Sequence, residues 1–341
     1  MGRKIITHKK IFLTGVLIAA AFLASLCIWT GEMKEASATD VITIRIASVS
    51  GPAHLHNKVM REWAKKVNKE TNGRLRLRVL DGAQLGGERD YIEGMQLGNI
   101  QMAQVSTGPI SGFIPEFMVC SLPYVFQDYE QIQSFLNGPV GKELFARLEQ
   151  KGIKGLTWFT NGFRSVFNRE KPINGPNDLK GMEIRVMESP LMIRTLNAMG
   201  ASATPMAYGE LYTALQQGVI DGAENAPGNM LNDKFFEVCK YYSLTEHFAS
   251  PGVVAISMIT YNKIPKDLQK YFVESATWLG EHEMAEDRKT QKKALDALVK
   301  KGVKINKMNK EPFRDAVKPV IKRFSKEIGP EIMDLVMKEM N

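Results

Sequence analysis

An arginine lies inside a segment that otherwise alternates like a buried strand. In "KGMEIRVMESP" (Lys180–Pro190), three apolar residues fall on one face of the predicted strand and Arg185 falls on the other. The strand leads directly into a predicted helix, so Arg185 is expected near the carboxyl end of its strand, where open α/β sheets bind ligands. A guanidinium shielded from water there can bind a carboxylate through two charge-assisted hydrogen bonds, each contributing roughly 1.5–3 kcal/mol.

A structural role for Arg185 is the alternative. The aliphatic stem of an arginine can pack on a sheet while its head pairs with an acidic residue of the protein, such as Glu183 or Glu210. Periodicity alone leaves both interpretations open.

Predicted strands and helices alternate along the chain, as they do in α/β sheets that place a residue such as Arg185 at the carboxyl end of a strand. The first half predicts strand, helix, strand, helix, strand, and hence a parallel sheet with crossover helices. The middle predicts a second α/β unit. These segments are, in order, 42–49, 53–73, 74–80, 88–99 and 100–107, then the strands 153–160, 164–170 and 182–187, the helices 190–200 and 209–218, and the strand and turn 219–225. A helical pattern over residues 265–302 is too long for one small domain, so it is expected to span or brace both.

The N-terminus predicts export. Four basic residues precede the apolar run "IFLTGVLIAAAFLASLCIW", and Ala36-Ser37-Ala38 then offers small residues at the positions that signal peptidase reads. We therefore expect residues 1–38 to be a cleaved signal peptide, with a retained membrane anchor as the alternative. Lipid attachment at Cys27 is disfavoured because Leu26 stands where lipoprotein processing needs a small side chain.

Composition excludes several classes of function. The 45 basic and 37 acidic residues give a net charge of +8, but the basic residues are dispersed, which argues against nucleic acid as a partner. There is no nucleophile-elbow, phosphate-loop, dinucleotide-binding or zinc motif, so we expect neither an enzyme nor a cofactor. Cys120 and Cys239 lie in apolar surroundings and are expected to be buried free thiols, with a single disulfide as the alternative.

The middle of the chain resembles a known family. The block "NGFRSVFNREKPINGPNDLKGMEIRVMESPLMIRTLNAMGASATPMAYGELYTALQQGVIDGAEN" (Asn161–Asn225) is similar to the solute-binding proteins of TRAP (tripartite ATP-independent periplasmic) transporters. "AQLGGERDYIEGMQLGNIQMAQVS" and "IPKDLQKYF" extend the resemblance over the rest of the mature chain. It implies a two-lobed α/β fold of the periplasmic-binding-protein type, with the ligand in the cleft and one long bridging helix. The implied domains are residues 39–162 with 251–290 and residues 163–250 with 291–341.

The resemblance also implies a ligand site. Arg185 corresponds to the arginine that forms a salt bridge with the ligand's carboxylate, and Arg164 of "NGFR" to a second contact. Asn225 of "DGAEN" would hold the carboxylate from the other side, and Tyr208 of "PMAYGELY" would cover the ligand. A purely structural role remains the alternative for three of them: Arg164 as a surface strand residue, Asn225 as a turn residue and Tyr208 as part of the core.

The other lobe is expected to hold the far end of the ligand. Glu88 and Ser106 fall where members of the family vary with substrate, and His54 lies in the loop after the first strand. A carboxylate at Glu88 can accept two sugar hydroxyls but would repel a second acid group, which favours a polyhydroxy monoacid. His54 could donate to the same hydroxyls or be a loop or capping residue. A metal pair of His54 and His56 lacks a third ligand close in sequence.

Within the family, "RVMESP" and "YYSLTEHF" look most like receptors for sugar acids such as glucuronate and galacturonate, followed by four-carbon dicarboxylate and sialic acid receptors. Keto-acid receptors that bind through a metal tend to carry Trp after the glutamate where this chain has Asn225, so we expect no metal. The expected protein is a periplasmic monomer that delivers an organic acid to the large and small membrane subunits of a TRAP permease. An enzyme, such as a lyase acting on sugar acids, is the alternative from another class.

Overall fold

The computed structural model of the chain describes residues 41–340. The predicted signal peptide, with Cys27 and the Ala36-Ser37-Ala38 cleavage site, lies outside the described residues. The boundaries predicted for two domains stay a prediction.

A parallel three-stranded arrangement forms the first half of the sheet, as the alternating segments predict. β1 (Ile42–Ala47) pairs in parallel with both β2 (Leu75–Leu80) and β3 (Met102–Ser106). The crossover helices are α2 (Leu55–Glu70) and α3 (Glu88–Leu97). The first of them buries Val59, Trp63 and Val67 at a helical spacing.

Two long strands connect this half of the sheet to the other, and here the sequence prediction was wrong. The segments 153–160 and 164–170 form one bent strand, β4 (Ile153–Asn168), whose pairing shifts register between Thr160 and Phe163. Gly162 allows the bend because its φ of +71° is a left-handed conformation. The partner, β8 (Tyr241–Ser257), runs antiparallel to β4 and to β3, so the sheet is mixed and not purely parallel. Bulges of this kind bend strands next to binding sites.

The second half of the sheet repeats a parallel arrangement. β5 (Glu183–Val186) pairs in parallel with β6 (Ser202–Pro205) and with β7 (Gly222–Asn225), and β7 lies antiparallel to β4. The full order is β2-β1-β3-β8-β4-β7-β5-β6, with β9 (Lys304–Asn306) beside β8. The α/β class is confirmed.

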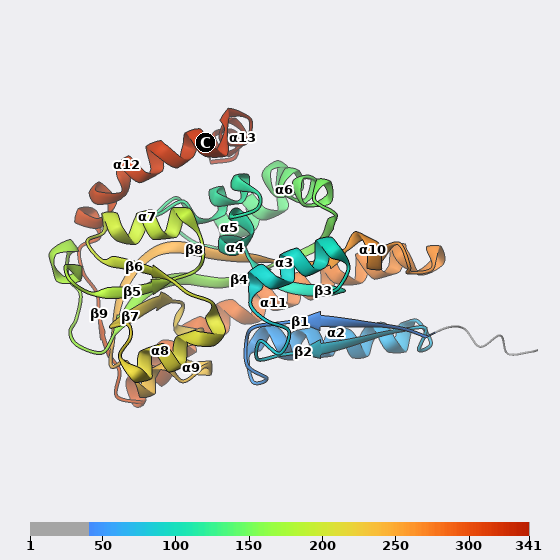
Figure 1. The fold of residues 1–341 in the computed structure, drawn as a ribbon, viewed down its shortest axis with the longest axis horizontal. Helices are drawn as coiled ribbons and strands as arrows, with labels where there is room; N and C mark the ends of the chain where they lie inside the picture. The colour runs from blue at the N-terminus through green and yellow to red at the C-terminus, as the bar shows by residue number, and fades with distance from the viewer. Residues whose placement is uncertain (1–40, 341) are drawn as a thin grey trace, which may run out of the picture. The chain divides into compact units, whose positions relative to one another are not determined.

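Helices cover both faces of this sheet (Figure 1). The remaining elements are α4 (Thr107–Ser111), η1 (Pro115–Ser121), α5 (Tyr129–Asn137), α6 (Pro139–Gln150), η2 (Pro176–Leu179), α7 (Pro190–Ala198), η3 (Tyr208–Glu210), α8 (Leu211–Gln217), α9 (Pro227–Asn232), η4 (Phe235–Glu237), α10 (Met258–Tyr261), α12 (Glu311–Ile328) and α13 (Pro330–Met340).

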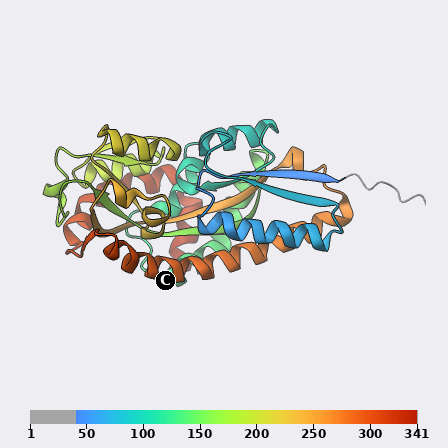
Figure 2. The ribbon, with the colours of Figure 1, turned by 90° about the horizontal axis from the view of Figure 1, so that it is seen from below.

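One long helix, α11 (Lys266–Lys300), runs lengthwise beside α2 and the bent strand β4 (Figure 2). Its 35 residues correspond to about 52 Å at 1.5 Å per residue. The buried face is apolar towards both ends, with Phe272 and Leu298 as examples, but it is polar in the middle, where Glu283, Asp287 and Gln291 are buried. That polar stretch lies against the bend of β4, because Thr160 N donates to Glu283 Oε2 over 3.2 Å.

Close packing of α11 on β4 makes Gly280 sensitive to substitution. A Cβ at this position would lie 2.0 Å from Thr157 Oγ1 and 2.8 Å from the carbonyl oxygen of Trp158. Alanine is favoured over glycine in helices by about 1 kcal/mol, yet we expect Gly280→Ala to lower the free energy of unfolding by about 1–3 kcal/mol because the interface is overpacked. Urea denaturation measures this free energy. The control is Glu281→Ala, at the next and exposed position, which should change stability by less than about 0.5 kcal/mol. A Gly280→Ala protein as stable as the wild type would contradict the packing described.

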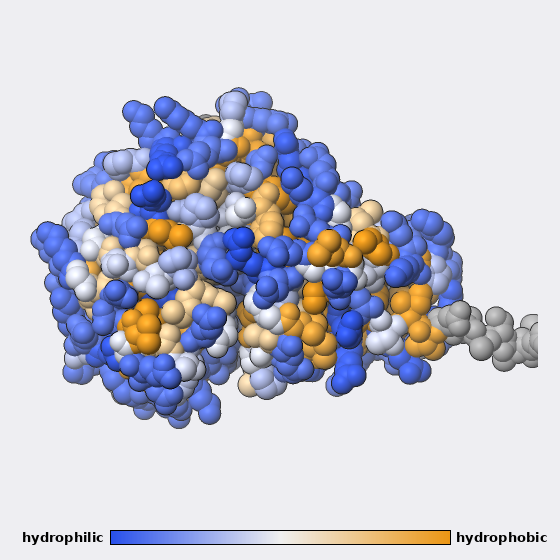
Figure 3. Space-filling model, in the orientation of Figure 1, coloured by the Kyte–Doolittle hydropathy of each residue, from blue (hydrophilic) through white to orange (hydrophobic). Residues whose placement is uncertain are grey.

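The face of the molecule seen in Figure 3 is mainly hydrophilic, with apolar residues in several separate places. Among the large exposed hydrophobic side chains, Leu97 ends α3, Val219 lies in the turn between α8 and β7, and Val299 is near the end of α11. Among residues 41–340, no helix is long and apolar enough to cross a membrane. Cys120 and Cys239 are buried free thiols, as expected, and the disulfide alternative is excluded.

Candidate ligand-binding site

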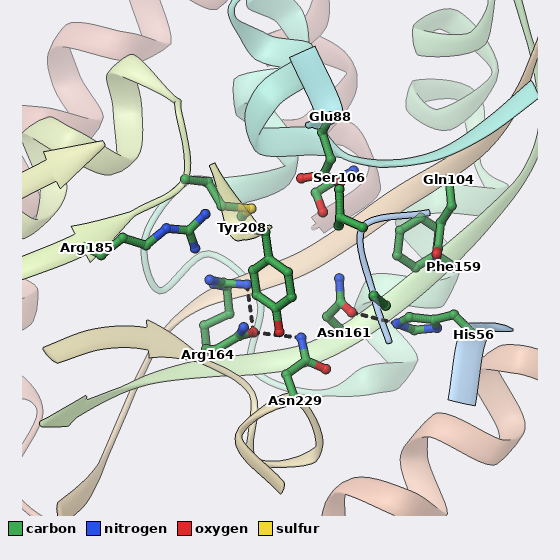
Figure 4. A pocket seen from close by; sticks show the side chains of 14 residues that line it. His56, Glu88, Gln104, Ser106, Phe159, Asn161, Arg164, Arg185, Tyr208 and Asn229 are labelled. Carbon is green, nitrogen blue, oxygen red and sulfur yellow. Dashed lines mark hydrogen bonds between the residues drawn. The ribbon is translucent and has the colours of Figure 1, made fainter. Parts of the chain in front are cut away.

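A pocket lies where the two halves of the sheet meet, close to the carboxyl ends of β3, β5 and β7. It holds about 390 Å³ of space not filled by protein atoms, its mouth included. Its walls combine residues from both halves of the fold (Figure 4). They are Val49, Ser50, His56, Glu88, Gln104, Ser106, Phe159, Asn161, Arg164, Arg185, Met187, Tyr208, Asn225 and Asn229.

Arg185 projects from β5 into this pocket and is only 2% exposed. Its Nε and Nη2 donate to the carbonyl oxygen of Met206 over 2.9 and 2.6 Å, while Nη1 has no hydrogen-bond partner. Within the described residues it makes no ion pair, so the predicted alternative of pairing with Glu183 or Glu210 does not occur. Burial, together with the charge of Arg164, lowers its pKa to about 10, which still leaves it charged at neutral pH. The side chain is therefore a buried cation with free N–H groups.

Arg164 is a cation of a different kind because the protein itself neutralises it. Its Nε lies 2.5 Å from Glu224 Oε2, and its Nη2 donates to Glu224 Oε1 over 2.8 Å. The Nη1 group donates to Asn225 Oδ1 over 2.9 Å and to Ser250 Oγ over 3.4 Å. Neither member of this ion pair is more than 3% exposed. Arg164 lines the pocket, where the sequence placed it, but the sequence did not reveal that Glu224 occupies the Nε–Nη2 edge of its guanidinium.

Asn225 connects Arg164 to the pocket. Its Oδ1 accepts hydrogen bonds from Arg164 Nη1, from its neighbour's backbone N–H and from Asn229 Nδ2, the last over 2.8 Å. Its Nδ2 is buried without a partner. A ligand oxygen can therefore accept from Asn225 Nδ2 while the amide stays fixed through its oxygen.

Tyr208 lies beside Arg185, whose Cζ is 5.7 Å from the centre of the tyrosine ring. Its hydroxyl donates to Asp233 Oδ2 over 2.6 Å, which fixes the ring as a wall of the pocket. The predicted position of Tyr208 in the site thus agrees with the structure.

Glu88 and Ser106 form the opposite wall, as the sequence suggested. Glu88 begins α3, and its Oε1 accepts the backbone N–H of Ser106 over 2.6 Å. Burial raises the pKa of the Glu88 carboxyl, which opposes the lowering effect of the Ser106 hydrogen bonds. The carboxyl group can thus accept and, when protonated, donate hydrogen bonds inside the pocket.

The structure brings His56, and not the predicted His54, to the pocket wall. His54 Nε2 donates to Asn229 Oδ1 over 2.9 Å, so it reaches the pocket only through that amide. His56 lies on the buried face of α2, one turn before Val59 and Met60. The helical period that predicted the apolar stripe could have identified His56, because its side chain falls on the same face. Gln104, Asn161 and Asn229 were also missed; buried amides in strands and short helices carry no distinctive sequence pattern.

The described residues contain no group of three or more His, Cys, Asp or Glu side chains that could hold a metal ion. What the pocket offers is one uncompensated cation with free donors, an amide donor at Asn225 and a hydrogen-bonding carboxyl group across from them. This combination suits an anion with polar substituents.

Comparison with known proteins agrees with that chemistry. The family model described as "Bacterial extracellular solute-binding protein, family 7" matches residues 46–327. A solute-binding protein of Verminephrobacter eiseniae is 35% identical over 303 residues, which cover 88% of this chain and 90% of the relative.

Two solved structures were determined with a bound sugar acid. A TRAP periplasmic solute-binding protein from Sulfitobacter sp. with bound β-D-galacturonate has a TM-score of 0.83 and 32% identity, and the match covers 86% of this chain and 98% of that one. Another from Chromohalobacter salexigens, with bound D-glucuronate, has a TM-score of 0.83 and 31% identity, covering 87% and 99% of the two chains.

Proposed function

Because the chain belongs to family 7 of the bacterial extracellular solute-binding proteins, a two-lobed α/β family of TRAP solute receptors, we propose that its ligand is a hexuronate such as D-galacturonate or D-glucuronate. The observation that carries this proposal is the state of Arg185. A buried guanidinium with no acidic partner among the described residues and a free Nη1 lacks one thing, a carboxylate. The ligand would supply it.

Charge in the pocket favours a monoacid. Glu224 compensates Arg164, so Arg185 leaves one positive charge for the ligand. A second carboxylate on the ligand would have to lie near Glu88, the buried carboxyl group of the opposite wall. A four-carbon dicarboxylate is therefore a weaker candidate than a hexuronate. Sialic acid, a larger sugar acid with one carboxylate, is the other alternative ligand.

The hydroxyl groups of a hexuronate would find partners on the wall opposite Arg185. Glu88, Gln104 and Asn161 all line the pocket there and offer both donors and acceptors. We assign Arg185 and Asn225 to the carboxylate, Tyr208 to the face of the ligand, and Glu88 with Ser106 to its hydroxyls. Arg164 and His54 act through Asn225 and Asn229, which they hold in place.

Binding would stabilise the closed arrangement of the lobes, because only that arrangement lets one ligand contact Arg185 and Glu88 together. The closed receptor would then dock on the large and small membrane subunits of a TRAP permease. We propose further that the protein is exported to the periplasm through cleavage near Ala38, acts as a monomer and is not an enzyme.

A thermal-shift screen tests the proposed ligand class. The mature protein is heated with hexuronates, aldonates, four-carbon dicarboxylates, keto acids and sialic acid, each in turn. A ligand present at 100 times its Kd stabilises the folded state by about 2.7 kcal/mol, so hexuronates should raise the melting temperature most. A larger shift with a dicarboxylate, and none with hexuronates, would contradict the assignment. The best ligand, incubated with the protein, should be recovered unchanged, whereas an unsaturated product would favour a lyase.

A further inference from the structure

A short contact joins the pocket wall to the long helix. His56 Nδ1 lies 2.5 Å from Glu283 Oε1, and the other ring nitrogen, Nε2, lies 2.7 Å from Asn161 Oδ1. The side chains of His56 and Glu283 are 2% and 3% exposed. The backbone N–H of Thr160 also donates to Glu283 Oε2. One buried chain of polar groups thus runs from α11 through α2 to Asn161 in the pocket.

With Asn161 Oδ1 facing His56, this arrangement needs a proton on the pair. An amide oxygen can only accept, so His56 Nε2 must carry a hydrogen for Asn161 Oδ1. If the imidazole is neutral, its Nδ1 is then an acceptor, and so is an ionised Glu283. Two acceptors 2.5 Å apart repel each other, and a proton on either atom relieves that repulsion. The pair therefore holds one proton more than a neutral imidazole and a carboxylate.

That proton determines what Asn161 presents to the pocket. With the proton in place, Asn161 Oδ1 faces His56, and Figure 4 shows its amide nitrogen pointing away from the ring, towards the side of Ser106 and Glu88. Without it, His56 would donate from Nδ1 to the Glu283 carboxylate, and Nε2 would become an acceptor. Asn161 would then have to turn its amide by 180° and present its oxygen to the ligand.

We propose that Glu283 and His56 are positioning residues whose shared proton holds Asn161 as a hydrogen-bond donor to the bound sugar acid, so that ligand binding is coupled to this proton. The coupling has a second source, since a bound anion favours an additional positive charge in the wall beside it. The inference rests on the proposed function, and it goes further by making α11 part of the binding site.

Other titratable groups surround the pair. His54 lies against His56 with ring centres 4.4 Å apart, and Asp287, one helical turn along α11, bonds to Gln291. Asp233 at the end of α9, Lys58 on α2 and Tyr129 on α5 complete the set. Burial raises the pKa of Glu283 to about 8 and lowers that of His56 to about 4, which agrees with a proton held mainly on the Glu283 carboxyl group beside a neutral imidazole.

Calorimetric titration with D-glucuronate, in buffers of different ionisation enthalpy, counts the protons taken up on binding. With a Glu283 pKa of about 8, the pair is already protonated at about pH 6.5 and has lost most of its proton by about pH 9. We expect almost no uptake at the lower pH and up to one proton per ligand at the higher one. Affinity should fall over this range, by at most tenfold per pH unit.

Glu283→Gln is the matched variant. A glutamine keeps the size of the side chain, accepts from Thr160 N and donates its amide hydrogen to His56 Nδ1, so it fixes Asn161 as a donor without a titrating proton. D-Glucuronate should still bind, with equal affinity at the two pH values and no proton uptake. Glu274→Gln, an exposed position on the same helix, and Asp287→Asn should both retain the uptake of the wild type.

The wild type alone can overturn the inference. Tight binding with no proton uptake and no loss of affinity at about pH 9 would contradict it, as would uptake that persists in Glu283→Gln or disappears in Asp287→Asn. Failure of the proposed function gives a different result, because D-glucuronate would then not bind at either pH.

Discussion

Replacing Arg185 with methionine should weaken hexuronate binding by about 100-fold to 10,000-fold while the protein stays folded. Each charge-assisted hydrogen bond to the carboxylate contributes roughly 1.5–3 kcal/mol, and the free hydrogens on Nη1 and Nη2 allow two of them. Methionine keeps much of the apolar stem that packs in the site, so the loss reports the guanidinium itself. Isothermal titration calorimetry with D-galacturonate measures the ratio of the dissociation constants.

Stability without ligand provides the internal control for this variant. In the ligand-free wild type, Arg185 is a buried charge without an acidic partner among residues 41–340, so its removal should leave the free energy of unfolding unchanged or higher. Arg185→Lys should also bind poorly, because an ammonium group cannot reproduce the planar, two-bond geometry. Near-wild-type affinity in Arg185→Met would exclude the carboxylate role, and near-wild-type affinity in Arg185→Lys would exclude its two-bond form.

Replacing Arg164 should also have a large effect, but on stability: unlike the loss of Arg185, the loss of Arg164 should destabilise the ligand-free protein. Arg164→Met should lower the free energy of unfolding by about 3–5 kcal/mol, since it leaves the fully buried Glu224 without its partner. In the wild type, burial and the charge of Arg164 lower the pKa of His247 to about 3, so this neutral imidazole, 3.8 Å from Glu224 Oε2, adds no second cation to the pair. Chemical denaturation in the absence of ligand measures the loss.

A second substitution separates the charge effect from lost packing. Adding Glu224→Gln to Arg164→Met removes the unpaired charge, so the double variant should recover part of the lost stability. Equal stability of Arg164→Met and the wild type would show that the ion pair contributes nothing. Comparing Arg164 with Arg185 distinguishes a cation that supports the fold from one that is kept available for a ligand.

The sequence predicted the local parts of the fold well. The alternation of β1, the apolar stripe of α2 and the uninterrupted pattern of α11 all depend on residues near each other in the chain, and each matches the structure closely. The strand β8 was missed, and β4 was divided in two at Gly162, because a bent strand shared by both halves of the sheet is defined by long-range pairing.

In the candidate site, too, local motifs were predictable from the sequence and long-range contacts were not. Arg185, Asn225, Tyr208, Glu88 and Ser106 were placed at the pocket from motifs, and all of them line it. The sequence could not show that Glu224 neutralises Arg164, since charge pairing across 60 residues depends on the packing of β4 against β7. Nor could it predict the contact between His56 and Glu283, whose partners come from helices far apart in the chain.

A crystal structure of the protein with D-galacturonate or D-glucuronate would show whether Arg185 binds the carboxylate of the ligand. We expect the carboxylate to accept hydrogen bonds from Arg185 Nη1 and Nη2 and from Asn225 Nδ2, with the sugar hydroxyls directed towards Glu88 and Asn161. A ligand bound with its carboxylate away from Arg185, or an Arg185 side chain still bonded only to Met206 O beside an occupied pocket, would contradict it.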